Sequence, residues 1–118
     1  MKIGISGSRD WFDYNKFKAY LDAFRKHIQI DMIISGCADG VDDMAYKYAK
    51  KEGITFVGHP PKPEDGYPHK FFRRNLRIVE QCETLIAFPK GKSSGTRHAI
   101  SLAKKLKKPY YIVEIPDE

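Results

Sequence analysis

Short apolar runs alternate with amphipathic segments along the 118 residues of this chain. The runs are typical of buried strands, and between them apolar residues recur every three or four positions, as on one face of a helix. The expected strands are Lys2–Ser6, Met32–Ser35, Ile54–Val57, Thr84–Phe88 and Tyr110–Ile115. The expected helices are Asn15–His27, a segment that begins near Val41 and is ended by Gly53, Phe71–Cys82 and Thr96–Lys107.

Five strands that alternate with four helices predict an α/β fold, because parallel neighbours need right-handed helical crossovers. We expect one Rossmann-like, doubly wound domain over residues 1–118, with helices on both faces of a mostly parallel five-stranded sheet. The expected strand order is 3-2-1-4-5. In such sheets a ligand binds beyond the carboxyl ends of the strands, where the strand order reverses. Residues directly after each strand are therefore the candidates for function.

Two local patterns add detail to this interpretation. Asp13 precedes the first expected helix and is suited to cap it, and Phe72, Leu76 and Val79 in the third have the spacing of a buried face. The segment Gly58–Lys70 holds four of the seven prolines. Because proline fixes φ and lacks an N–H group, we expect a loop there. The sequence leaves open whether this loop closes over a site as a lid.

Three of the strand-to-helix loops are rich in glycine, serine and threonine. They are Gly7–Asp10, Ser35–Gly40 and Gly91–Thr96. Glycine lets the backbone approach a ligand closely, and a helix that begins after such a loop directs unpaired N–H groups at an anion. Ordinary turns and caps use the same residues, so a single loop of this kind says little. Three loops at one edge of the sheet favour a single phosphate-binding crevice.

Charged side chains in these loops suit a phosphorylated ligand that carries a sugar. Arg9 can form a bidentate pair with a phosphate or carboxylate, and Thr96 offers a hydroxyl at the start of the last helix. Asp42, between Asp39 and Asp43, can bond a ribose hydroxyl or Mg²⁺. The helix dipole also favours acidic residues at that position without any ligand.

The third expected helix opens with Arg73, Arg74 and Asn75, where the helix dipole disfavours cations. This conflict favours an anion or a carboxylate nearby, and a surface ion pair is the alternative. Trp11 and Tyr67 are suited either to stacking on a base or to ordinary packing.

The composition of the chain limits the kinds of ligand, location and cofactor that we expect. Lysine and arginine number 21 against 15 acidic residues, and the formal charge of +6 favours anionic ligands, although solubility alone accounts for such a charge. No apolar run approaches the ~20 residues that span a membrane, and no secretory signal pattern is present. The histidines lack metal-binding spacing, and Cys37 and Cys82 are too few for a disulfide scaffold. We expect a cytoplasmic protein with free thiols, no metal and no resident cofactor.

Standard nucleotide motifs do not account for the loops. Gly91-Lys92-Ser93 is similar to the end of a P-loop, but the position that must be glycine is Ile86, within an expected strand. The dinucleotide fingerprint G-x-G-x-x-G is also missing from the sequence.

Four stretches together resemble the SLOG superfamily. They are Ile5–Arg9, Ser35–Ala45, Arg74-Asn75 and Gly95-Thr96. This Rossmann-like group includes DNA-processing protein A (Smf), the LOG cytokinin-activating phosphoribohydrolases and molybdenum-cofactor carrier proteins. The chain looks most similar to the small single-domain branch related to YpsA. The resemblance implies a Rossmann-like fold, nucleotide-derived ligands and assembly into a homo-oligomer.

The resemblance leaves open whether any bond is cleaved. LOG enzymes carry a catalytic glutamate in the motif P-G-G-x-G-T-x-x-E, and here Gly95-Thr96 is followed by Ala99 at that position. Their Arg-Lys pair corresponds to Arg74-Asn75. Without a positioned carboxylate, glycosidic cleavage loses its main contributor, and Asp39 or Asp42 could replace it only by reaching the anomeric carbon.

The sequence therefore predicts a protein that binds a nucleotide or nucleotide-derived phosphorylated ligand, such as an ADP-ribose derivative or a nucleoside monophosphate, as a sensor or carrier. Two alternatives stay open. One is N-glycosidic hydrolysis of nucleoside monophosphates, and the other is binding of single-stranded nucleic acid. The expected ligand-binding residues are Gly7, Ser8, Arg9, Gly36, Gly40, Asp42, Arg74, Asn75, Gly95 and Thr96.

Overall fold

A parallel five-stranded sheet lies at the centre of the computed structural model, which describes residues 1–67 and 69–116. The strand order is β3-β2-β1-β4-β5. This order and the α/β architecture confirm the prediction from sequence. The strands are β1 Lys2–Gly7, β2 Met32–Ser35, β3 Thr55–Gly58, β4 Thr84–Phe88 and β5 Tyr110–Ile112. The helices are α1 Tyr14–Arg25, α2 Val41–Glu52, the 3-10 turn η1 Pro63–Asp65, α3 His69–Gln81 and α4 Ser94–Lys105.

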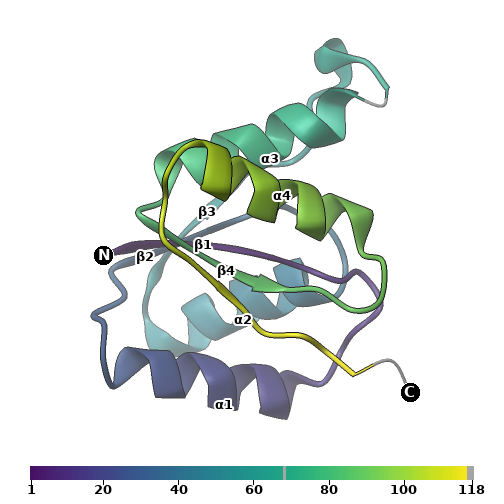
Figure 1. Ribbon diagram of the computed structural model, residues 1–118. Helices are drawn as coiled ribbons and strands as arrows, with labels where there is room; N and C mark the ends of the chain where they lie inside the picture. Colours follow the sequence, from purple (N-terminus) through teal and green to yellow (C-terminus); the bar gives the residue numbers. More distant parts are fainter. Residues whose placement is uncertain (68, 117–118) are drawn as a thin grey trace.

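The helices cover both faces of the sheet, so that α1 and α2 lie on one face and α3 and α4 on the other (Figure 1). Two hydrophobic cores result. The first gathers Phe17, Leu21 and Tyr48 from α1 and α2 against the sheet. The second gathers Ile78 and Ile100 from α3 and α4. Strand β4 is buried along its whole length, as parallel strands between two helical layers usually are.

The carboxyl end of β1 is the point at which the strand order reverses. There Gly7 pairs with Phe88 at the end of β4. A Cβ at Gly7 would lie 2.6 Å from side-chain atoms of Val41, so the missing side chain lets α2 begin directly against the end of β1. At the end of β2, the Ser35 hydroxyl donates to the Ile5 carbonyl at 2.6 Å. The carboxyl ends of the three strands β1, β2 and β4 are thus held close together.

Helix ends agree with the sequence more closely than the last strand does. Asp13 caps α1 as predicted, because its Oδ1 accepts a hydrogen bond from the Lys16 amide at 3.2 Å. Helix α4 ends before the predicted Lys107, whose φ of 57° is left-handed and cannot continue an α-helix. The predicted strand Tyr110–Ile115 is wrong at its end: β5 stops at residue 112, and Ile115 forms only an isolated bridge.

The proline-rich segment Gly58–Lys70, predicted to be a loop, also holds regular structure. Its first residue belongs to β3, residues 63–65 form η1, and its last two residues begin α3. A proline fits the first position of a helical turn because no intrahelical amide bond is lost there. Pro68, one of the four prolines that the prediction uses, lies outside the described residues.

The buried face of α3 differs from the predicted one. Phe72, predicted to face the core, is 44% exposed, while Val79 is buried as predicted. The buried residues of the helix also include Arg74 and Asn75. The spacing of apolar residues predicts the wrong buried face for α3, because the helix turns polar side chains inward in its first two turns.

Two further expectations concern membranes and thiols. Of the helices formed by residues 1–67 and 69–116, none has the length and apolar character needed to cross a membrane. Cys37 is exposed and Cys82 is buried, and neither forms a disulfide.

Leu21 tests the first core. It is fully buried in α1, and we expect Leu21→Ala to lower the free energy of unfolding by about 2 to 5 kcal/mol, because the truncation leaves a cavity. Urea denaturation measures the change. The matched control is Leu106→Ala at an exposed leucine, for which a loss as large as that of Leu21→Ala would contradict this core.

Candidate functional site

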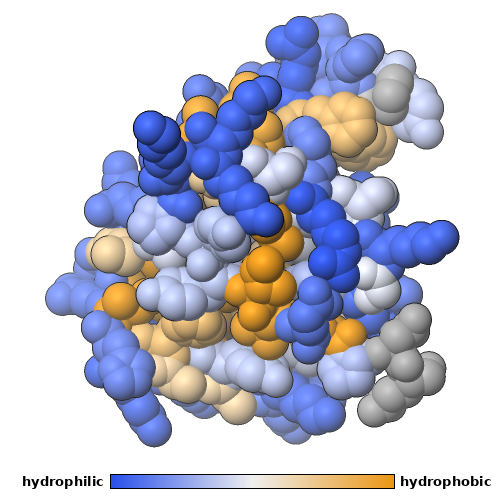
Figure 2. Space-filling view, in the orientation of Figure 1, coloured by the Kyte–Doolittle hydropathy of each residue, from blue (hydrophilic) through white to orange (hydrophobic). Residues whose placement is uncertain are grey.

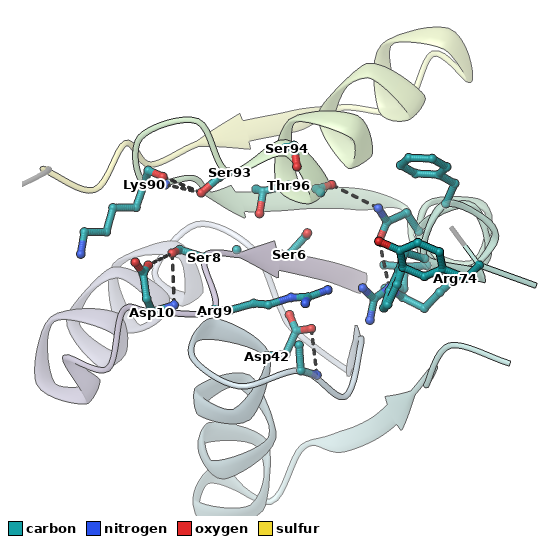
Figure 3. Close-up of a pocket in the computed structure, with 18 residues that line it drawn as sticks. Ser6, Ser8, Arg9, Asp10, Asp42, Arg74, Lys90, Ser93, Ser94 and Thr96 are labelled. Carbon is teal, nitrogen blue, oxygen red and sulfur yellow. Dashed lines mark hydrogen bonds between the residues drawn. The ribbon is translucent and has the colours of Figure 1, made fainter. Parts of the chain in front are cut away.

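A pocket of about 570 Å³ opens at the carboxyl edge of the sheet, beside the reversal between β1 and β4. All three glycine-rich loops border it, together with the first turns of α3. Figure 3 shows Ser94 and Thr96 on one side of the pocket and Arg9 and Asp42 on the other. The lining residues are Ser6, Gly7, Ser8, Arg9, Asp10, Ala38, Asp42, Tyr67, Phe71, Phe72, Arg74, Asn75, Ile78, Lys90, Ser93, Ser94, Gly95 and Thr96.

The first turn of α4 faces this pocket without a side-chain cap. Ser93 stands at the N-cap position, but its hydroxyl bonds the amide and carbonyl of Lys90 at 2.9 and 2.6 Å instead of the helix. The Arg97 amide is the first to bond back, to the Ser93 carbonyl at 3.0 Å. The amides of residues 94–96 have no intrahelical acceptor, because the first turn of any helix lacks one. Such a turn is well suited to bind an anion.

Arg74 is a buried charge on the wall of the pocket. Its residue is only 6% exposed, and its Nε–H donates to Asn75 Oδ1 at 3.0 Å. Within the described part of the chain, its two terminal nitrogens have no hydrogen-bond or ion-pair partner. Burial lowers the pKa of Arg74, and the nearby Asp42 carboxylate opposes that shift. A guanidinium in this position is ready to pair with an anion.

Asn75 joins Arg74 to the start of α4. Its Nδ2 donates to the Gly95 carbonyl at 3.1 Å and lies 3.3 Å from His98 Nδ1. Since its Oδ1 accepts the bond from Arg74, one side chain fixes both the guanidinium and the uncapped helical turn. Asn75 is 3% exposed and lines the pocket, so we assign it a positioning role.

Asp42 faces the same space from the first turn of α2. Its Oδ2 accepts from the Ala38 amide at 3.4 Å, and its Oδ1 lies 3.0 Å from the oxygen of the Ser35 hydroxyl, whose one hydrogen is donated to the Ile5 carbonyl. Burial raises the pKa of the Asp42 carboxyl above its ordinary value, and the positive charge of Arg74 opposes the rise. An acceptor pair in this position suits sugar hydroxyls.

Gly36 explains how the two charges approach each other. A Cβ at this position would lie 2.4 Å from Arg74 Nη1 and 2.6 Å from Asp42 Oδ2. Any side chain there would displace one of the two groups. The two groups lie on either side of the glycine and form no ion pair within 4.0 Å among the described residues.

Arg9 and Lys90 supply further positive charge at the pocket. Arg9 is exposed, and Figure 3 shows its side chain extending toward Arg74. Ser8 Oγ donates to Asp10 Oδ1, and this hydrogen bond lowers the pKa of Asp10. Lys90 adds to the lowering by its charge. Figure 3 thus shows Lys90 at one end of the pocket and Arg74 at the other. The carboxylates of Asp10 and Asp42 lie on the side opposite Ser94 and Thr96.

Of the ten predicted ligand-binding residues, eight line the pocket, and Gly36 and Gly40 do not. Gly40 has a φ of +73°, and a Cβ there would lie 2.3 Å from the Ser8 carbonyl oxygen. These two glycines therefore serve contacts within the protein. Gly95 is different, because a Cβ there would meet no atom within 4 Å.

Other candidates from the sequence lie elsewhere. Asp39 and Asp43 are exposed outside the pocket, and Asp43 pairs with Lys47 at 3.0 Å. Trp11 stacks on Phe88 at 6.1 Å between ring centroids and packs against the first core, which supports its packing interpretation. In residues 1–67 and 69–116, no three His, Cys, Asp or Glu side chains gather as a metal site.

Sequence reasoning missed several lining residues. Lys90 follows β4 at the carboxyl edge, and its position was a signal that could have found it. Phe71 and Phe72 carried the opposite signal, because aromatic residues at the start of a helix suggest a core. Ser6 and Ile78 line the pocket without any sequence feature that marks them.

A parallel sheet in this order, with its crevice at the reversal point, defines a Rossmann-like domain of the doubly wound class. Residues 1–65 match the model of the YspA, cpYpsA-related SLOG family, called YAcAr. The match covers more than half of the chain, and the chain belongs to this family. The SLOG resemblance seen in the sequence is thereby confirmed.

Among individual proteins, the chain is 29% identical over 111 residues to the Gene 61 protein of Mycobacterium phage D29, covering 88% of this chain and 89% of that protein. DNA processing protein A from Streptococcus pneumoniae has a similar fold, with a TM-score of 0.77 and 16% identity over 94% of this chain. DNA processing protein A from Helicobacter pylori, described with a single-stranded DNA binding mode, also has a similar fold. Its TM-score is 0.66, and its sequence identity is 19% over 95% of this chain. This chain covers only 49% and 64% of those two structures.

Asp42 gives the pocket a pH-dependent contribution to stability. Because its pKa is raised in the folded protein, the native state holds more protons than the unfolded state between the two pKa values, and stability falls as pH rises through that range. We expect the free energy of unfolding of Asp42→Asn, relative to wild type, to increase as the pH rises above about 4, the ordinary pKa of an aspartate. Denaturant titrations across this range measure it.

The matched control is Asp43→Asn, which removes an exposed carboxylate at the next position. Parallel pH profiles for wild type and Asp42→Asn would show that Asp42 does not titrate differently in the two states.

Proposed function

We propose that the pocket binds a phosphorylated, nucleotide-like ligand, with its phosphate between Arg74, Arg9 and the first turn of α4. The observation that carries the proposal is the buried Arg74 guanidinium, whose terminal nitrogens have no partner among the described residues. These nitrogens open on the pocket, so an anion bound there takes the place of water around the positive charge. A phosphate supplies several acceptor oxygens that satisfy such a group.

The opposite wall supports the same ligand chemistry. The uncapped amides of residues 94–96 act on an anion together with the positive end of the helix dipole. Gly95 leaves open space over this turn, and the Thr96 hydroxyl adds a donor. Gly7 and Ser8, at the carboxyl end of β1, also line the pocket. The phosphate would thus contact two helical layers at once.

A sugar fits between the phosphate and the α2 side of the pocket. Asp42 presents carboxylate oxygens there, and ribose hydroxyls are donors that such oxygens accept. Membership of the SLOG family and the pocket volume of about 570 Å³, within the usual range for small-molecule sites, favour a nucleotide-sized ligand. We place the protein among sensors or carriers of such ligands.

The proposal is binding rather than cleavage. Ala99, which stands where LOG enzymes have a glutamate, is 1% exposed and packs into the second core. Asp42 is the lining carboxylate that could take over the role of that glutamate, but Ser35 and Ala38 hold it in place. Hydrolysis of a nucleoside monophosphate needs a carboxylate free to act at the anomeric carbon.

Calorimetric titration with a panel of nucleoside monophosphates, diphosphates and ADP-ribose tests the site. We expect Arg9→Ala to weaken binding by roughly tenfold to a hundredfold, because charged hydrogen bonds to phosphate are lost. Gly95→Val should abolish binding while leaving the fold intact, since its side chain meets no protein atom. Arg25→Ala is the control, at an exposed arginine that bonds Tyr48 and Glu52 outside the pocket. Equal binding by all four proteins would reject the site.

Single-stranded nucleic acid is a second candidate ligand, favoured by the fold shared with the Helicobacter pylori protein and by the charge of +6. If it is the ligand, the logarithm of the affinity for an oligonucleotide should fall steeply and linearly with the logarithm of salt concentration. Fluorescence anisotropy at several salt concentrations measures the slope. Undetectable binding at low salt would remove this candidate.

A further inference from the structure

An aromatic wall closes one end of the pocket. It consists of Tyr67, Phe71 and Phe72, which all line the pocket. Tyr67 is 80% exposed and Phe72 44%. Figure 2 shows hydrophobic surface over the projecting end of α3, bordered by hydrophilic side chains. Large aromatic surface left open beside a polar cavity marks a binding surface, because burying the same rings would have been favourable.

The wall is held in place from two sides. Arg77 donates to Asp65, which ties η1 to α3, and this bond lowers the pKa of Asp65. On the other side, the Phe72 ring packs on His98 of α4 at 4.6 Å between centroids. Tyr67 meets Phe71 edge to face at 6.0 Å. The rings are therefore ordered before any ligand arrives, which lowers the entropic cost of binding.

Arg9 lies over the wall. Its guanidinium carbon is 5.3 Å from the centroid of the Phe71 ring. Arg9 is exposed and makes no hydrogen bond to any described residue, so little holds it there beyond a cation–π contact of about 0.5 to 1 kcal/mol. The Lys70 ammonium also lies over Phe71, at 5.2 Å from the centroid. The ring is thus in contact with two mobile side chains, and the contact with Arg9 can be exchanged for another at small cost.

We propose that Phe71 is the platform for a nucleobase, which takes the place of Arg9 on the ring while Arg9 turns to the phosphate. This inference rests on the proposed function and specifies the ligand as a nucleoside 5′-monophosphate or a molecule that contains one. Base–aromatic stacking contributes about 1 to 3 kcal/mol per base and accepts every base. Purines bind more tightly than pyrimidines, because a larger ring system buries more surface.

A mononucleotide fits the observations better than a strand. Of the three rings in the wall, Phe71 is the one with cations over it, at 5.3 Å for Arg9 and 5.2 Å for Lys70. Lys90 and Asp10 lie at the end of the pocket away from Arg74 (Figure 3). A strand binds along a row of several stacking side chains and phosphate contacts. The three rings border one cavity of about 570 Å³, which has the size of a site for one small ligand rather than for a row of nucleotides.

Titrations with AMP, CMP and ribose 5-phosphate separate the base from the phosphate. We expect wild type to bind AMP at least tenfold more tightly than ribose 5-phosphate, with CMP between them. Phe71→Leu keeps apolar bulk but removes the ring, and it should weaken AMP binding by about tenfold and leave ribose 5-phosphate unchanged. Phe71→Tyr keeps the ring and should retain the wild-type affinities.

Phe12→Leu is the matched control, because Phe12 is an exposed phenylalanine outside the pocket. Equal affinity of wild type for AMP and ribose 5-phosphate, unchanged in Phe71→Leu, would overturn the base platform and leave the phosphate site standing. Failure of wild type to bind any of the three probes would instead reject the proposed function. Binding of a four-nucleotide DNA far tighter than AMP, at high salt, would replace the mononucleotide by a strand.

Discussion

Two buried opposite charges, Arg74 on α3 and Asp42 on α2, face each other across Gly36 without meeting. The charge that the pocket offers an anion depends on this arrangement. The sheet must bring helices from its two faces to the same edge, and β2 must be followed by a residue that adds no side chain. A charge kept apart from its nearest counter-charge keeps its capacity to bind something else. The polar inner face of α3 is thus part of the site rather than a defect of the core.

The strand order was predictable because alternation of strands and helices leaves few topologies for a parallel sheet. Convergence of the three loops followed from that order. The orientation of α3 was not predictable from sequence. The apolar pattern predicts that Phe72 faces the core, whereas the helix turns Arg74 and Asn75 inward and leaves Phe72 exposed. Gly36 and Gly40 illustrate the same limit: glycine in a loop indicates close approach, but sequence does not say whether a ligand or the protein's own atoms approach.

The backbone fold is shared with other proteins, whereas the side chains around the pocket are those of this chain. The fold is shared with proteins that have only 16% and 19% sequence identity to this chain. In this chain, Ala99 is buried on the inner face of α4, and the rings of Tyr67, Phe71 and Phe72 line the pocket. A shared frame with individual side chains at its rim allows ligands to change without a change in topology.

Asn75 links two structural layers through one amide group, with Arg74 bonded to its oxygen and the Gly95 carbonyl bonded to its nitrogen. His98 lies 3.3 Å from the same amide nitrogen through its Nδ1. The position of the guanidinium and the position of the opening turn of α4 are therefore not independent, and a change of the Asn75 side chain would disturb both together.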